Sequence, residues 1–140
     1  MKAESFQPIR MLLVEDDPTG RLYVKEYLEN IGHTVIEATN GREALDRLRE
    51  QHFDLIFMDI MMPVMDGIET TQRIRCGDAG EEVRKIPIVA LTAYDLRQAP
   101  EALHSLDMFE YLIKPVAEEL LDQVTAKIAE LRIRQELRIA

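Results

Sequence analysis

The sequence predicts an α/β fold: a doubly wound sheet of five parallel strands in the order 2-1-3-4-5, with helices on both faces. Short apolar runs alternate five times with helical patterns, which is typical of parallel strands joined by crossover helices. The run from Phe53 to Met58 carries no charge after Asp54, as expected of a strand buried on both faces of such a sheet. The order 2-1-3-4-5 is the common arrangement for a chain of this size.

Length and composition indicate one domain in a chain of 140 residues. We expect residues 1–8 to be a flexible lead, residues 9–131 to form the domain and residues 132–140 to extend its last helix. The net charge of −9 argues against direct binding of nucleic acid, because a polyanion would be repelled. Cys76 is the only cysteine, which excludes an internal disulfide and fits a reducing compartment, so we expect a cytoplasmic protein.

The sequence also argues against a membrane segment and a histidine metal site. The amino terminus lacks the apolar core of a signal peptide, and no apolar segment is long enough to span a membrane. The three histidines, His33, His52 and His104, lie too far apart for typical ligand spacing.

The first strand and helix have clear boundaries. Ile9–Val14 is an apolar run and is predicted to be a buried strand. The next helix is expected to begin at Pro18 with Asp17 as its N-cap, and Gly32 is expected to end it. The inner face of this helix is predicted from apolar residues at helical spacing: Val24, Tyr27, Leu28 and Ile31.

The middle of the chain continues the alternation. Residues 33–38 are β-branched and mixed in polarity, which favours a strand nearer an edge. Asn40-Gly41 is expected to begin the second helix. The buried strand from Phe53 ends at Asp59, and a third helix is predicted over Gly67–Arg75 with Asp66 as its N-cap.

Five further elements complete the predicted fold, four of which follow from pattern alone and one of which depends on a proline. In order, the first four are a polar connection at 77–85, a strand at 86–91 ending at Thr92, a strand at 108–113 ending at Lys114, and a last helix from about Val116. A short helix should hold residues 101–105. Because proline breaks a helix interior, that helix should begin at Ala99-Pro100 and leave residues 94–98 as a loop.

Polar residues follow the strands that border the crevice of this sheet. Glu15 and Asp16 follow the first strand, and Asp59, Thr92 and Lys114 end the third, fourth and fifth. Ligands bind at this edge, where the strand order reverses. Three carboxylates raise one another's pKa unless a cation lies between them, and Mg²⁺ is the hard cation that prefers oxygen ligands. A carboxylate nucleophile with a metal, an ammonium group and a hydroxyl suits phosphoryl transfer.

These residues carry a resemblance to a known family. The matching segments are LLVEDD at 12–17, FMDIMMPVMDG at 57–67, ALTA at 90–93 and YLIKP at 111–115. In order and spacing they resemble the receiver domain of the response-regulator family of two-component signalling, chemotaxis-regulator-like, over about residues 8–130. The resemblance implies the flavodoxin-like receiver fold.

The resemblance also implies roles for individual residues. Asp59 would be the phosphoacceptor, supported by the hydroxyl of Thr92 and the ammonium group of Lys114. The Mg²⁺ site would be formed by an acidic pair, the acceptor and one backbone carbonyl: Glu15, Asp16, Asp59 and that of Met61. Thr92 and Tyr111 would switch conformation, and the Lys114–Pro115 bond would be cis, which is affordable only before proline.

Two positions are expected to tune dephosphorylation. Met61 and Tyr94 lie two residues past Asp59 and Thr92. In the family, the side chains at these two positions flank the path of the water that hydrolyses the aspartyl phosphate. Neither carries the carboxylate or amide that would best orient water, so we expect a long-lived aspartyl phosphate. The chain departs from the family before the fifth strand, where residues 107–110 replace a Gly-x-Asp-Asp run.

Each of these residues also has a structural interpretation. Tyr111 could be half-buried packing, Thr92 a cap and Lys114 a solvated lysine, while Asp17 is assigned as a cap alone. Four methionines near the acceptor suggest either packing or an adaptable surface, with packing favoured: Met58, Met61, Met62 and Met65.

Two other functions fit less well. A Mg²⁺-dependent enzyme of the topoisomerase-primase type needs an Asp-x-Asp pair, and the chain has Asp59-Ile60-Met61. A flavodoxin-like cofactor binder would need a loop that accepts a flavin phosphate, and Glu15-Asp16-Asp17 would repel it.

The expected function is therefore a phosphoacceptor switch rather than an enzyme, one that promotes its own phosphorylation and slow autodephosphorylation. The donor would be a histidine kinase or a phosphotransfer domain. No effector sequence follows, so a downstream protein would read the switched surface, and the chain could equally be the receiver piece of a hybrid kinase.

The last helix suggests a further contact. Its predicted sheet-facing stripe is Val116, Leu120, Leu121, Val124, Ile128 and Leu131. Ile133, Leu137 and Ile139 lie out of phase with that stripe. They indicate either a homodimer through this helix or a frayed terminus.

Overall fold

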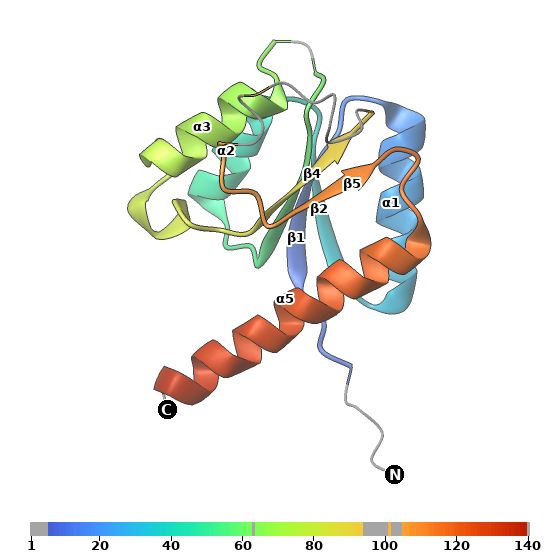
Figure 1. Cartoon of the computed structure of the whole chain (residues 1–140), viewed down its shortest axis with the longest axis vertical. Coiled ribbons are helices and arrows are strands. Elements are labelled where there is room, and N and C mark those ends of the chain that lie inside the picture. Colours follow the sequence, from blue (N-terminus) through green and yellow to red (C-terminus); the bar gives the residue numbers. More distant parts are fainter. Residues whose placement is uncertain (1–5, 63, 94–100, 102–104, 140) are drawn as a thin grey trace.

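The computed structural model describes residues 6–62, 64–93, 101 and 105–139 (Figure 1). Strands and helices alternate along the chain: β1 (Arg10–Val14), α1 (Pro18–Ile31), β2 (Thr34–Ala38), α2 (Gly41–Glu50), β3 (Leu55–Asp59), α3 (Gly67–Cys76), η1 (Glu81–Val83), β4 (Ile88–Thr92), β5 (Glu110–Ile113) and α5 (Glu118–Ile139). The five strands pair in parallel in the order β2-β1-β3-β4-β5. The predicted fold class and strand order are confirmed.

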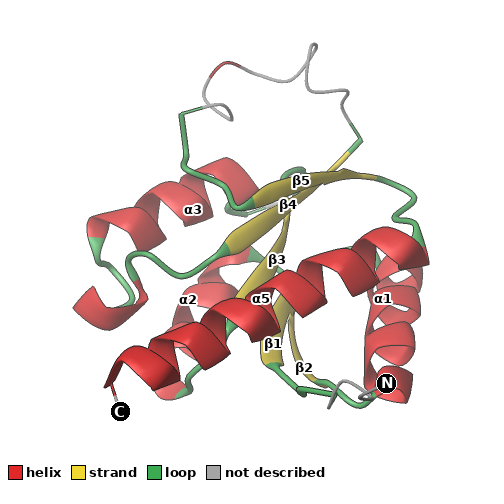
Figure 2. Cartoon of the chain, turned by 60° about the horizontal axis from the view of Figure 1, so that its bottom comes forward, coloured by secondary structure: helices red, strands yellow, loops and turns green. Residues whose placement is uncertain are grey.

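The sheet lies between two layers of helices (Figure 2). Successive residues of a strand point to opposite faces, so Leu13 and Phe57 pack toward α1 and α5, while Leu12 and Ile56 pack toward α2 and α3. All five residues of β3 are buried. Burial on both faces explains why this strand reads as a continuous apolar run and carries its charge only at the end.

Helix caps form where the sequence predicts them. The side chains of Asp17, Asn40 and Asp66 each accept a hydrogen bond from the backbone N–H three residues on, at 2.8–2.9 Å. Gly32 ends α1 with a φ of 122°, a conformation that glycine adopts without the strain of a Cβ. These caps fix where α1, α2 and α3 begin, on the connections that follow β1, β2 and β3.

The inner face of α5 differs from the predicted stripe. Leu120 and Leu131 are 38% and 41% exposed, whereas Thr125 and Ala129 are buried against the sheet. The hydroxyl of Thr125 donates to the carbonyl of Leu121 at 2.9 Å, so its polar group is satisfied inside the helix. Small side chains at these positions let α5 pack closely, and the apolar pattern alone overestimated its core by two leucines.

Two further differences concern the connections. Residues 77–85 contain the η1 turn, and Ala79 and Val83 are buried, so the segment packs on α2 and α3 rather than forming a purely polar link. Strand β5 is shorter than predicted, since Met108 and Phe109 precede it and pack against the core, although the backbone N–H of Phe109 still donates to the carbonyl of Ile88 at 2.8 Å. The predicted loop at 94–98 and the predicted helix start at Ala99-Pro100 lie outside the described residues.

Among the described residues, no helix combines the length and apolar composition that a membrane crossing requires.

Candidate functional site

The carboxyl ends of β1, β3, β4 and β5 bring the predicted polar residues to one edge of the sheet. Asp59 ends β3 and is 2% exposed, and Glu15 follows β1 and is 4% exposed. Lys114 follows β5, and its Nζ lies 2.8 Å from Oε1 of Glu15 and 3.0 Å from Oδ1 of Asp59. The lysine is therefore engaged with buried carboxylates and is not simply solvated.

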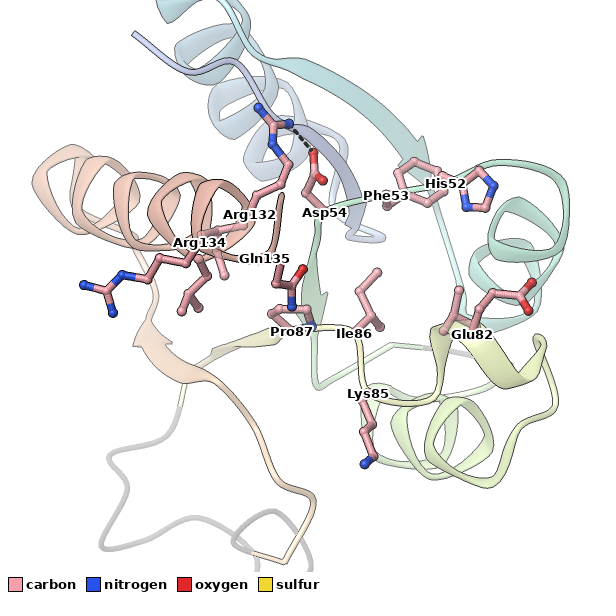
Figure 3. Close-up of a pocket in the computed structure, with 13 residues that line it drawn as sticks. His52, Phe53, Asp54, Glu82, Lys85, Ile86, Pro87, Arg132, Arg134 and Gln135 are labelled. Carbon is pink, nitrogen blue, oxygen red and sulfur yellow. Dashed lines mark hydrogen bonds and ion pairs between the residues drawn. The ribbon is translucent and has the colours of Figure 1, made fainter. Parts of the chain in front are cut away.

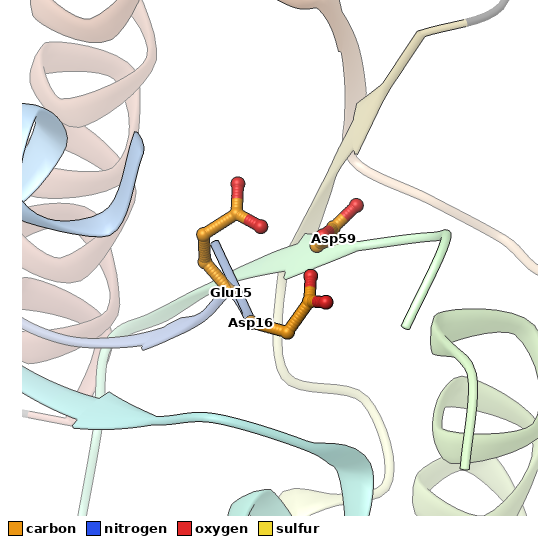
Figure 4. Close-up of side chains that lie close together, drawn as sticks. All are labelled: Glu15, Asp16 and Asp59. Carbon is orange, nitrogen blue, oxygen red and sulfur yellow. The ribbon is translucent and has the colours of Figure 1, made fainter. Parts of the chain in front are cut away.

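The carboxylates of Glu15, Asp16 and Asp59 gather at this edge of the sheet (Figure 4). One oxygen each of Glu15, Asp16 and Asp59 lies within 4.8 Å of the other two. Oδ2 of Asp59 is buried and has no hydrogen-bond partner among the described residues. An unsatisfied buried oxygen beside two further carboxylates fits a hard divalent cation, and these three residues would hold Mg²⁺.

The charges at this site shift the pKa values of its groups. Burial, and then the adjacent Glu15 carboxylate, raise the pKa of Asp59 to about 8, although Lys114 acts in the opposite direction. Burial acts to raise the pKa of Glu15 and to lower that of Lys114. At Glu15, the hydrogen bond with Asp59 and the contact with Lys114 outweigh burial, so the pKa of Glu15 is lowered. At Lys114, the contacts with both carboxylates outweigh burial, so its pKa is raised. A cation among these carboxylates would favour the ionised form of Asp59.

The positions predicted to switch lie on β4, which pairs with β3, and on β5, the next strand in the sheet. Thr92 ends β4 and is 1% exposed, and its carbonyl accepts a hydrogen bond from the backbone N–H of Lys114 at 2.8 Å. Tyr111 lies half-buried on β5 beside Ala90, and burial raises its pKa. The Lys114–Pro115 peptide bond is cis, in the conformation that the resemblance implies.

Of the two positions assigned to dephosphorylation, Met61 and Tyr94, only Met61 lies among the described residues. Met61 is 58% exposed, and its backbone N–H donates to Oδ1 of Asp59 at 3.2 Å. Its side chain therefore borders the acceptor rather than filling the core, whereas Met58 and Met65 are buried and Met62 packs against the core as predicted. Tyr94 lies outside the described residues.

The segment after Asp59 turns sharply back over the end of β3. The backbone N–H of Gly67 donates to the carbonyl of Ile60 at 3.1 Å. A Cβ at Gly67 would lie 2.2 Å from the carbonyl oxygen of Asp59 and 2.8 Å from Cα of Ile60. Only glycine allows this approach, which holds the start of α3 against the acceptor residue.

One residue near the acidic pair was missed in the sequence. Nη1 of Arg21, in the first turns of α1, donates to the carbonyl of Glu15 at 2.9 Å and lies 3.4 Å from that of Asp16. Its Nε donates to Oε1 of Glu37 at 3.0 Å. The only available signal was its position one to two helical turns after the acidic pair, which does not distinguish it from a solvated arginine.

A cavity of about 490 Å³ lies at the opposite end of the strands (Figure 3). Phe53 and Asp54 precede β3 there, Ile86 and Pro87 precede β4, and the carboxyl-terminal half of α5 closes one side. Nη1 of Arg132 lies 3.2 Å from Oδ2 of Asp54 across this end of the sheet. The residues of the acidic site do not line this cavity, so it is separate from the candidate site.

Comparison with known proteins matches the same residues. Residues 11–126 match the family model described as the response regulator receiver domain. Over 127 residues the chain is 38% identical to the sensor histidine kinase GacS of Pseudomonas protegens, covering 91% of this chain and 14% of the kinase. It is 34% identical over 107 residues to the polar-differentiation response regulator DivK of Brucella ovis, covering 76% of this chain and 85% of DivK.

A solved structure gives the same likeness. The receiver domain of the sensor histidine kinase PA1611 from Pseudomonas aeruginosa is 32% identical to this chain with a TM-score of 0.79, covering 88% of this chain and 98% of that one. That crystal structure has a magnesium ion coordinated in its active-site cleft. The chain thus spans a small part of the kinase GacS, but nearly all of a separate receiver domain.

Proposed function

The chain belongs to the response regulator receiver family of two-component signalling, and from this premise we propose that Asp59 accepts a phosphoryl group from a phosphohistidine of a partner protein. The observation that carries the proposal is the buried Asp59 carboxylate with Lys114 Nζ at 3.0 Å and two further carboxylates beside it. A nucleophile, a cation and a set of metal-binding oxygens then occupy one edge of the sheet, as phosphoryl transfer requires.

In the proposed reaction, an oxygen of Asp59 attacks the phosphorus of the phosphohistidine. The new P–O bond forms as the P–N bond breaks, and the bonding electron pair returns to the imidazole nitrogen. Lys114 stabilises the negative charge on the phosphoryl oxygens, and the hydroxyl of Thr92 donates to one of them. Mg²⁺, when bound by Glu15, Asp16, Asp59 and the carbonyl of Met61, would supply the remaining neutralisation of charge.

We propose that the phosphoryl group shifts an equilibrium between two conformations of the domain. Thr92 would move toward the phosphoryl group, and Tyr111 would turn inward from its half-buried position on β5. The surface formed by β5 and α5 would change as a result, and a downstream protein would bind the changed surface.

The lifetime of the aspartyl phosphate is proposed to depend on Met61 and Tyr94. The Met61 side chain is exposed beside the acceptor and has no group that could orient a water for attack on the phosphorus. We therefore expect slow autodephosphorylation, with Met61→Asn faster than the parent. Equal decay rates would remove Met61 from this role.

We propose a histidine kinase or a phosphotransfer domain as the donor, and the cytoplasm as the location, where the exposed thiol of Cys76 would stay reduced. We retain residues 1–8 as a lead, 9–131 as the receiver domain and 132–140 as an extension of α5, and we propose that this extension forms a homodimer contact.

The direct test is phosphotransfer from a purified histidine kinase that carries a labelled phosphohistidine. The parent chain should gain the label in the presence of Mg²⁺, and Asp59→Asn should not. Asp54→Asn is the matched control, because Asp54 precedes the same strand at its opposite end. Label that appears on Asp59→Asn as fast as on the parent would contradict the proposal.

A further inference from the structure

We propose that Arg21 is a positioning residue that holds the loop of Glu15 and Asp16 in the geometry that binds Mg²⁺. The inference rests on the proposed function, because it assumes that these carboxylates hold the metal. It assigns a task to a side chain that contributes no ligand itself. Arg21 would act through the backbone carbonyls of the two acidic residues.

The contacts of Arg21 join its guanidinium group to the backbone of the acidic loop, Glu15 and Asp16. Nη1 lies 2.9 Å from the carbonyl oxygen of Glu15 and 3.4 Å from that of Asp16. The N–H of Glu15 still donates to the carbonyl of Ala38 at 3.0 Å, which continues the pairing of β1 with β2. The loop therefore leaves the sheet at Glu15, and Arg21 binds it at the first two carbonyls beyond the strand.

A second anchor fixes the orientation of the guanidinium group. Nε of Arg21 donates to Oε1 of Glu37 at 3.0 Å, and Glu37 lies on β2 opposite Leu13 of β1. The Arg21 side chain is only 19% exposed, so its guanidinium N–H groups are largely shielded from solvent. A guanidinium group can bind a carboxylate and a carbonyl at once because its donors form a rigid fork.

Lys25 provides a matched comparison on the same helix. Its Nζ lies 3.2 Å from Oε2 of Glu37, so both cations of α1 pair with one carboxylate. The contacts of Lys25 in the structure do not include the carbonyls of the acidic loop. Removing either side chain takes one positive charge from α1, but only the loss of Arg21 frees the loop.

A positioning role and a purely electrostatic role predict opposite changes in Mg²⁺ affinity when Arg21 is removed. If Arg21 acted only as a nearby positive charge, its removal would strengthen Mg²⁺ binding, because the cation would meet less repulsion. If Arg21 positions the loop, its removal weakens Mg²⁺ binding. The carboxylate ligands must then become ordered as the metal binds, and this ordering costs free energy. Partners that orient metal ligands typically contribute about 10–100-fold in affinity.

The experiment is calorimetric titration of the full chain with Mg²⁺ alone, in the parent, Arg21→Met, Arg21→Lys and Lys25→Met. Arg21→Met should weaken the Kd by about tenfold or more. Lys25→Met should leave the Kd unchanged or slightly tighter. Arg21→Lys keeps the charge but cannot reach Glu37 and both carbonyls together, so its Kd should lie between those of the parent and Arg21→Met. Circular dichroism checks that each variant is folded.

Each outcome decides the proposal. A Kd of Arg21→Met equal to or tighter than that of the parent overturns it, as does equal weakening by Lys25→Met. If Arg21→Met fails to fold, Arg21→Lys decides, and an unchanged Kd for that variant overturns the proposal. Asp59→Asn tests the assumption that these carboxylates hold Mg²⁺. If this variant binds Mg²⁺ as tightly as the parent, the proposed metal site is wrong, and the proposed role of Arg21 is wrong with it.

Discussion

Nζ of Lys114 lies 3.0 Å from Oδ1 of Asp59, so a cation at the end of β5 reaches a carboxylate at the end of β3 across the intervening strand β4. The same nitrogen lies 2.8 Å from Glu15. Lys114 thus pairs with both carboxylates. In the proposed function it would therefore compete with Mg²⁺ for their oxygens and would also stabilise the negative charge of an incoming phosphoryl group.

Replacing Lys114 should separate its competition with Mg²⁺ from its stabilisation of the phosphoryl group. In Lys114→Met, Mg²⁺ should bind several-fold more tightly, because its competitor is gone. Phosphorylation by acetyl phosphate should nevertheless slow by about 10²-fold, the usual effect of losing one charge-stabilising donor. Lys127→Met is the control, since Lys127 pairs only weakly with Glu110 at 3.8 Å. Phosphorylation of Lys114→Met at the rate of the parent would contradict this role.

Gly67 should be intolerant of even one added methyl group. In Gly67→Ala the new Cβ meets the carbonyl oxygen of Asp59 at 2.2 Å, a backbone atom that cannot move aside cheaply. The free energy of unfolding should fall by about 3 kcal/mol. Gly20→Ala in α1 is the control, because its Cβ would meet side-chain atoms alone, with Oδ2 of Asp17 at 3.1 Å and Oε1 of Glu15 at 3.5 Å. Urea unfolding measures both, and equal stability of the two variants would show that β3 and α3 do not pack as described.

His33 should make stability depend on pH below neutrality. Its Nδ1 accepts the backbone N–H of Ile9 at 3.1 Å and its ring lies 5.0 Å from that of Phe6. Burial lowers the pKa of His33 below the ordinary value of 6.5, although Asp122 acts in the opposite direction. The unfolded chain therefore binds a proton at a higher pH than the folded chain. Stability should fall as the pH drops from about 6.5 toward the lowered folded-state value.

The test compares urea unfolding at pH 7.5 and pH 5.5. His33→Asn keeps an acceptor for the Ile9 N–H and should lose less stability between these two values than the parent. His52→Asn is the matched control and should retain the full dependence, since His52 is exposed. If His33→Asn and the parent change equally, the dependence comes from other groups.

Sequence reasoning predicted the strands and the polar residues at their ends because both depend on local pattern. The order of the strands followed instead from the arrangement that is common for a chain of this size. A strand that is buried on both faces, such as β3, can carry a charged residue only at its end. The position of Asp59 at the edge of the sheet can therefore be predicted without knowing which strands lie beside β3. The face of α5 was harder to predict, because Thr125 and Ala129 pack inward by being small, and apolarity favours Leu120 and Leu131 instead. The contacts of Arg21 were not predictable, since they join two backbone carbonyls, which no side-chain pattern reveals.

The extension of α5 should carry a contact between two copies of the chain. The helix continues without a break to Ile139, and Arg132 joins it to Asp54 of the domain. Sedimentation in the presence of beryllofluoride should show a dimer for the full chain and a monomer for a chain ending at Leu131. Arg132→Met in the full chain controls for the lost ion pair and should still dimerise. Full and shortened chains that are both monomeric would make the extension a linker or a loose end.

The most direct measurement of the central claim is the mass of the chain after incubation with acetyl phosphate and Mg²⁺, followed by mapping of the modified residue. The account predicts that one phosphate is added, that it is on Asp59, and that a chelator or Asp59→Asn prevents its addition. Asp54→Asn should be modified like the parent. A phosphate mapped to any other residue, or equal modification of Asp59→Asn, would contradict the assignment of Asp59 as the phosphoacceptor.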